Sequence, residues 1–164
     1  MLVPARNSLL APLGIAVALT MVAVLAAVPA PRSSAEQHKI EQLRDRLEFL
    51  RNATFRFRMD HFDDHGSLPL GLSGHDPEQQ LLGRTGLDGA PLTVAPGDRR
   101  GLGPYLDKLP VNPFNGLSSI RSLPGDQKTA DFQGSHGWVY LPATARVHPD
   151  LPGFDAFGRP FSDY

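Results

Sequence analysis

The chain has 164 residues, a formal net charge of -1 and no cysteine. Lys and Arg total 16 against 17 Asp and Glu, so the chain lacks the basic excess that holds nucleic acid, and no nucleic-acid partner is expected. The absence of cysteine excludes disulfides and thiolate metal sites. Sixteen Gly and sixteen Pro predict a single small domain that is rich in turns.

The first predicted element is an unbroken apolar run from Leu9 to Val28. About 20 helical residues span about 30 Å, which is the hydrocarbon thickness of a bilayer. We therefore expect residues 1–31 to form an N-terminal membrane anchor, with the membrane as a partner, and residues 32–164 to form a globular domain. The alternative is a cleaved secretory signal, because Arg6 supplies a basic start and Ser33-Ser34-Ala35 offers a cut before Glu36.

The orientation of the anchor is less clear from charge. One basic side chain, Arg6, precedes the apolar run, whereas four follow it closely: Arg32, Lys39, Arg44 and Arg46. The positive-inside rule would place the domain in the cytoplasm, whereas both an anchor and a signal are typical of exported domains.

A long amphipathic helix follows the anchor. Apolar side chains recur at spacings of three and four and predict a helix over about 34–64 with one apolar stripe: Ile40, Leu43, Leu47, Leu50, Thr54 and Phe57. His65-Gly66 is a candidate C-terminal cap, and Pro69 cannot continue the helix. A coiled-coil dimer would also use such a stripe, but it lasts only about three heptads, so packing against the chain's own sheet is favoured.

Short elements fill the rest of the chain. Asp76 and Pro77 predict a short helix over 77–82, followed by a long connection over 88–100 and one helical turn over 105–109. Strands are expected at 118–123, 137–141 and 145–147, giving a small antiparallel sheet within 118–148. The tail, 149–164, is expected to cover the domain surface with four aromatic side chains: Phe154, Phe157, Phe161 and Tyr164. The predicted fold class is α+β, loop-rich, with a long N-terminal helix, transmembrane and then amphipathic, packed on the sheet.

Three segments in this order resemble the type IV pilin and type II secretion pseudopilin group. The first is the helix end, from Arg58 to Pro69; the second reads GPYLDKLPVNPFNG from Gly103; the third reads GWVYLPAT from Gly137. The residues that carry the resemblance are Gly66, Pro69, Gly103, Pro104, Tyr105, Leu106, Pro110, Asn112, Pro113, Gly137, Trp138, Tyr140 and Pro142.

The resemblance implies a single-pass protein of the cell membrane whose domain lies on the exported, periplasmic side. It also implies a structural role without catalysis in the envelope or in secretion or pilus machinery, with other pilin-like subunits as partners. Two alternatives stay open: an exported binding module that does not polymerise, and a small metal-dependent enzyme.

The chain departs from that group at the processing site. In the group a glycine is followed by Phe-Thr-Leu-Ile-Glu, and the glutamate aligns a subunit with its neighbour. Here Gly14 is followed by Ile15-Ala16-Val17-Ala18-Leu19, without the phenylalanine or the glutamate. Prepilin cleavage and filament assembly are therefore in question, because a partnered carboxylate in lipid is a device for registry that this chain lacks.

The densest set of candidate metal ligands is Asp60, His61, Asp64 and His65. On a helix, His61 and His65 would lie one turn apart beside Asp64, which suits a divalent metal. A solvated helix end is the favoured explanation, because the HExxH spacing is absent. No cofactor or resident metal is expected.

Three further patterns in the sequence fit simple structural roles. Asp150, Asp155 and Asp163 could suggest calcium, but they lack a defined ligand spacing and are expected to be solvated turn residues. Ser135-His136 is expected to be a turn rather than part of a catalytic triad. Trp138 and Tyr140 share one strand face, which is expected to pack on the long helix.

Overall fold

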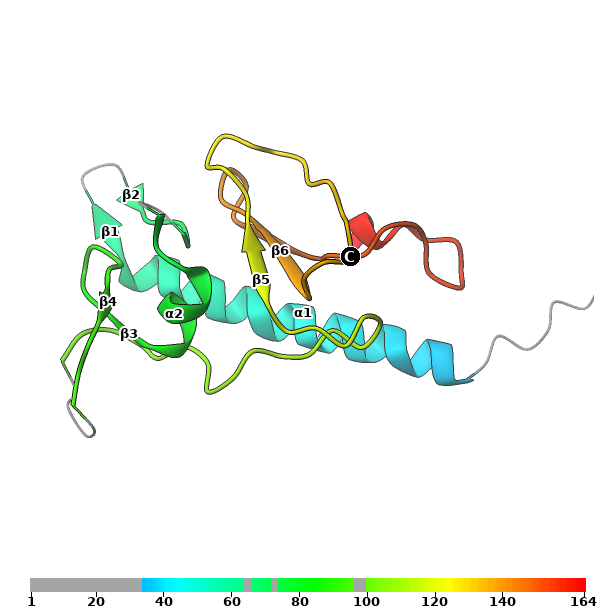
Figure 1. Cartoon of the computed structure of the whole chain (residues 1–164), viewed down its shortest axis with the longest axis horizontal. Helices are drawn as coiled ribbons and strands as arrows, with labels where there is room; N and C mark the ends of the chain where they lie inside the picture. Colours follow the sequence, from blue (N-terminus) through cyan, green and yellow to red (C-terminus); the bar gives the residue numbers. More distant parts are fainter. Residues whose placement is uncertain (1–33, 64–65, 72–73, 96–99) are drawn as a thin grey trace, which may run out of the picture. The chain divides into compact units, whose positions relative to one another are not determined.

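The computed structural model describes residues 34–63, 66–71, 74–95 and 100–164, all of which belong to one compact unit, Pro31–Tyr164 (Figure 1). The predicted anchor, Leu9–Val28, lies outside the described residues. Among the helices that the structure does describe, none combines the length and the apolar character needed to cross a membrane.

The long helix α1 spans Ser34–Asp60, and every stripe position predicted from the spacing is buried. Leu43, Leu50 and Phe57 have no exposed surface. The helix ends four residues before the predicted end at residue 64. After His61, whose N–H still donates to the Phe57 carbonyl (3.1 Å), the chain turns into a short antiparallel pair, β1 (Phe62–Asp63) with β2 (Gly66–Ser67).

The predicted cap at His65-Gly66 is therefore wrong. Gly66 has the positive φ that such a cap needs (117°), but it uses that conformation within the β1–β2 pair and not at a helix end. Sequence spacing alone could not separate the two uses, because both require the same left-handed backbone.

The segment between β2 and the main sheet contains one more pair of strands than predicted. Helix α2 spans Pro77–Leu82 as expected, and the Asp76 side chain caps it by accepting from the Glu78 N–H (2.9 Å). The expected connection 88–100 includes β4 (Pro91–Leu92), which pairs antiparallel with β3 (Arg84–Thr85).

The expected helical turn over 105–109 does not form. The backbone N–H groups of Tyr105 and Leu106 both donate to the Leu81 carbonyl, at 2.9 and 3.1 Å. That long-range pairing holds the segment extended on α2 and competes with local helical bonds.

The main sheet contains β5 (Ile120–Ser122), β6 (Trp138–Leu141) and β7 (Arg146–Pro149) in the order β5-β6-β7. The β6–β7 hairpin is antiparallel, as predicted, whereas β5 pairs parallel to β6. The prediction of a purely antiparallel sheet is therefore wrong. The connection over residues 123–137 is long enough for the crossover that a parallel pair requires.

The sheet packs on α1 through the face predicted for it. Trp138 and Tyr140 are fully buried in one core with Leu47, Leu50 and Phe57 of the helix. The other face is not solvated: Val139 and Leu141 are buried in a second cluster with Leu123, Ala130 and Phe132. The long β5–β6 connection supplies that cover.

The tail over 149–164 covers the core with only half of its predicted aromatic residues. Phe161, in the short helix η2 (Phe161–Asp163), and Tyr164 are buried in the main core. Phe154 and Phe157 remain exposed.

Candidate functional site

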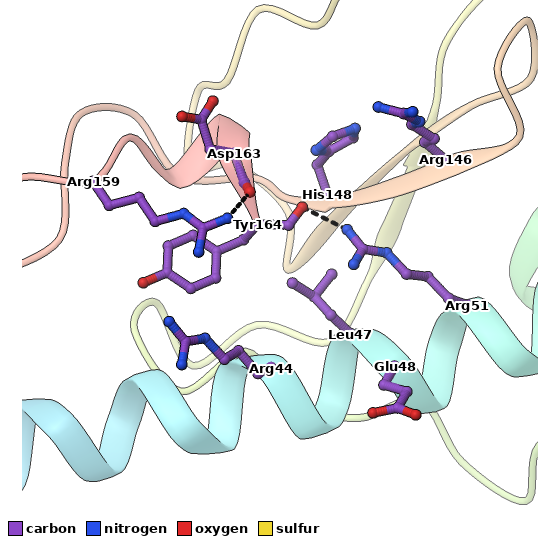
Figure 2. Close-up of a pocket in the computed structure, with 9 residues that line it drawn as sticks. All are labelled: Arg44, Leu47, Glu48, Arg51, Arg146, His148, Arg159, Asp163 and Tyr164. Atoms are coloured by element: carbon purple, nitrogen blue, oxygen red, sulfur yellow. Dashed lines mark hydrogen bonds between the residues drawn. The ribbon is translucent and has the colours of Figure 1, made fainter.

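A groove rich in arginine lies where α1, β7 and the tail meet (Figure 2). We call it the basic groove. Its volume is about 610 Å³, and nine residues line it: Arg44, Leu47, Glu48, Arg51, Arg146, His148, Arg159, Asp163 and Tyr164.

Each element contributes side chains to the basic groove through its own periodicity. On α1, Arg44, Glu48 and Arg51 are three or four residues apart, so they share the helix face beside buried Leu47. On β7, Arg146 and His148 are two residues apart and therefore point to the same side of the strand.

Arg51 joins the three walls of the groove. Its guanidinium donates to the Val147 carbonyl of β7 at 2.8 and 3.2 Å and to the main-chain oxygen of Tyr164 at 2.5 Å. A planar guanidinium can hold several acceptors at once, so Arg51 fixes helix, strand and tail in one arrangement.

The Tyr164 ring lies between two more arginines. The Cζ atoms of Arg159 and Arg44 lie 4.3 and 5.5 Å from the ring centroid, and Figure 2 shows them on opposite sides of the ring in that view. Arg159 also donates to the Asp163 carbonyl, and the Tyr164 hydroxyl donates to Asp155 (2.5 Å).

Burial and neighbouring positive charges lower the pKa values of two groups in the groove. Burial and then the charge of Arg146 lower the pKa of Arg51 from its ordinary value. Burial, followed by the charge of Arg51, lowers the pKa of His148, whose Nδ1 is buried without a hydrogen-bond partner in the described part of the chain. The four arginines that line the groove favour an anionic ligand.

Of the four candidate metal ligands, the two that the structure describes, Asp60 and His61, have protein partners. His61 is fully buried, with Nδ1 2.6 Å from the Phe57 carbonyl and Nε2 2.9 Å from Thr85 Oγ1, so both ring nitrogens have protein partners. Asp60 accepts from the Tyr105 hydroxyl (3.0 Å). The expectation that His61 lies at a solvated helix end is therefore wrong. Asp64 and His65 lie outside the described residues.

The three C-terminal aspartates lie in three different settings. Asp150 is fully buried and accepts from backbone and side-chain donors of the loop over residues 133–136. Asp155 is buried and accepts from the Phe157 and Arg159 N–H groups, whereas Asp163 lines the basic groove. The expectation of solvated turns is wrong for Asp150 and Asp155. Within the described ranges, no three His, Asp or Glu side chains are grouped to hold a metal ion.

Asp150 also brings Ser135 and His136 together. Ser135 Oγ is 2.9 Å from His136 Nδ1 and 3.3 Å from Asp150 Oδ2, which in turn is 3.9 Å from the same Nδ1. In a catalytic triad the serine and the aspartate use different ring nitrogens, so that the proton passes across the imidazole. Here both contacts fall on Nδ1, and the arrangement orders a loop.

The residues of the pilin-like resemblance converge on β6. Trp138 Nε1 donates to the Pro110 carbonyl (2.8 Å), and Asn112 Nδ2 donates to the Gly137 carbonyl (2.9 Å). Directly after the helix-end segment, the Leu70 N–H donates to the Tyr140 hydroxyl (3.4 Å). The three segments are thus neighbours in space and form structural contacts with one another.

Other residues of the resemblance have special backbone conformations, are buried or lie in turns. Pro104 follows a cis peptide bond, and Gly103 before it has a positive φ. Leu106 is buried with Tyr105, whereas Pro113 and Pro142 each begin a turn. Pro69 lies beside Pro142 in a small surface hollow.

No protein-family model, curated protein or solved structure matches this chain.

Sequence patterns do not predict the basic groove. The spacing of Arg44 and Arg51 on the helix was visible, but nothing in the sequence places Arg146 and Arg159 opposite them. The only signal was the run of basic residues on one edge of the apolar stripe, which also fits a solvated helix face.

Proposed function

We propose that this protein is a non-catalytic, membrane-anchored, pilin-like subunit with a structural role in the cell envelope or in secretion or pilus machinery. The anchor would be Leu9–Val28, and the domain would lie on the exported side. The proposal is supported by the pilin-like order of the three sequence segments and by the packing of one long helix on a small sheet.

The single observation that carries it is a second apolar surface at the end of α1. Phe55, Met59 and Phe62 are 59, 52 and 56% exposed and follow one another at spacings of four and three. Phe55 lines a hollow with Ala145 and Arg146 of the hairpin, so it is on the flank of α1. Scattered exposed apolar residues are ordinary, but Phe55 and Met59 lie one turn apart on α1 and Phe62 follows shortly after the helix end, so we take these three as the contact surface of the proposal.

The proposed mechanism is mechanical. The anchor and α1 would carry the domain at the membrane, and the apolar surface formed by Phe55, Met59 and Phe62 would be covered by a neighbouring subunit. Because the aligning glutamate of pilins is absent at Leu19, this surface would contribute to registry between subunits.

An exported binding module that does not polymerise is the second candidate, and the basic groove favours it. The two candidates differ in one respect that can be measured: only the first requires copies of the chain, or similar subunits, to meet at the apolar surface. The metal-dependent enzyme has no geometry in its favour within the described residues, because His61 is engaged at both nitrogens.

Cysteine cross-linking tests the proposal, since the chain has no cysteine of its own. Phe55→Cys and Met59→Cys variants of the full chain would be treated in native membranes with a short bismaleimide. We expect cross-linked species that contain a second subunit. Ala156→Cys, at another exposed position in the tail, is the matched control. Equal or lower yields at Phe55 and Met59 than at Ala156 would contradict the proposal.

The intact mass of the native protein tests the anchor separately. A start at Met1 is expected for a retained anchor, and a start at Ile15 would indicate pilin-type processing. A start at Glu36 would show that the apolar run is a removed signal, which contradicts the anchored subunit.

A further inference from the structure

We propose that the basic groove binds an acidic peptide segment of a partner protein. The inference is independent of the apolar surface on which the proposed function rests. Its first support is charge complementarity. Counting side chains, the groove holds four arginines against two carboxylates, Glu48 and Asp163, in a chain whose net charge is -1.

Two of the four guanidinium groups retain free hydrogen-bonding capacity. Arg51 and Arg159 donate to main-chain oxygens. Arg44 contacts the Tyr164 ring, and neither Arg44 nor Arg146 has a hydrogen-bond or carboxylate partner among the residues that the structure describes. A guanidinium fork matches a carboxylate in two parallel hydrogen bonds, so these two side chains are the expected primary contacts.

The rest of the groove is held in place before any ligand arrives. Arg51 connects α1 to β7 and to the tail, while Leu47 and the Tyr164 ring, both buried in the core, form apolar parts of the lining. A pre-formed site loses less conformational entropy on binding, and a volume of about 610 Å³ is within the range of peptide and small-ligand sites.

The lining favours a peptide over a phosphate compound. Glu48 and Asp163 would repel a phosphate group, which carries up to two charges, whereas they can accept hydrogen bonds from peptide N–H groups between acidic side chains. The arginine donors and the two carboxylate acceptors together fit a chain with spaced carboxylates.

Fluorescence anisotropy tests the proposal with full-length protein in mild detergent at low salt. The probe is a fluorescein-labelled octapeptide of alternating Glu and Gly, and its counterpart of alternating Lys and Gly serves as the control peptide. The test variant is Arg44→Gln with Arg146→Gln. The matched control variant, Arg56→Gln with Lys128→Gln, removes the same charge from exposed positions outside the groove. Thermal unfolding of each variant checks that the fold is retained.

We expect the Glu peptide to bind and the Lys peptide not to bind, with affinity falling as salt is raised. The groove variant should bind about tenfold more weakly and the control variant less than about twofold more weakly. Three outcomes would overturn the proposal: no binding of the Glu peptide, equal weakening in both variants, or displacement of the peptide by inorganic pyrophosphate at a lower concentration than by unlabelled peptide, which would indicate a phosphate ligand.

Discussion

Replacing Asp150 with Asn is the sharpest test of how this domain is held together. The Asp150 side chain has no exposed surface, and it accepts four hydrogen bonds. Its donors are the backbone N–H groups of Gln133 (2.9 Å) and His136 (3.0 Å), Ser135 Oγ (3.3 Å) and Arg121 Nη2 (3.3 Å). We expect Asp150→Asn to destabilise the fold by about 2–4 kcal/mol.

The magnitude follows from the donors that the amide cannot satisfy. Asparagine keeps one acceptor oxygen, but its NH₂ group would face two of the four donors. Each buried polar group left unpaired costs about 1–3 kcal/mol. Arg121 also loses its ion-pair partner, but its side chain is 21% exposed, so water compensates part of that loss.

The pH dependence of the unfolding free energy is a second test of the role of Asp150. Burial alone would raise the pKa of Asp150, but the N–H groups of Gln133 and His136 and the charge of Arg121 outweigh it, so the pKa is lowered. The carboxylate therefore stabilises the fold above its unfolded pKa of about 3.9, and this stabilisation is lost as the pH falls through the lower folded value. The difference between wild type and Asp150→Asn should narrow on acidification below about pH 4.

The assay is urea unfolding of the full-length protein at neutral and acidic pH, followed by the fluorescence of its single tryptophan, Trp138, on the adjacent strand. Asp131→Asn, at an exposed position of the same loop, is the matched control and should change the free energy of unfolding by less than about 0.5 kcal/mol. The reasoning is refuted if Asp150→Asn costs no more than the control, or if its deficit stays constant with pH.

Two further substitutions test close packing and the buried histidine, and both are measured by the same urea unfolding assay. A Cβ at Gly137 would lie 2.3 Å from the Leu117 carbonyl oxygen, so Gly137→Ala should lower the free energy of unfolding by about 1–3 kcal/mol. Gly125→Ala, where a Cβ meets open space, should lower it far less, and similar losses in the two variants would contradict the packing argument. Thr85→Val keeps the shape but leaves His61 Nε2 without its partner, so we expect a loss of about 1–3 kcal/mol, and an unchanged midpoint would show that this hydrogen bond contributes nothing.

Local patterns predicted much of the fold. The apolar spacing from Ile40 to Phe57 identified α1 and its buried face, the Asp76-Pro77 signal located α2, and the run Trp138–Leu141 with its following turn identified the β6–β7 hairpin. Each of these signals depends on backbone geometry, capping or alternation within a few neighbouring residues. Such signals can therefore be recognised in a single sequence.

The candidate site could not be predicted in the same way. Arg51 and Val147 are 96 residues apart, and Arg51 and Tyr164 are 113 apart, yet a single guanidinium joins them. The burial of His61 likewise depends on Thr85, 24 residues away, and on ring contacts with Phe57 and Tyr105. Contacts between such distant residues produce no periodic pattern in the sequence, so they cannot be recognised from it.

The sequence by itself determined the long helix and its buried stripe, the short helix, the hairpin and the side of β6 that faces the core. Only the tertiary structure decided the parallel pairing of β5, the early end of α1, the burial of His61 and Asp150, and the gathering of four arginines in one groove. The physical reason is the range of the forces. Helix and turn signals are satisfied within a few residues, whereas strand order, burial of polar groups and charge clusters depend on which distant segments compete for the same hydrogen bonds and the same core.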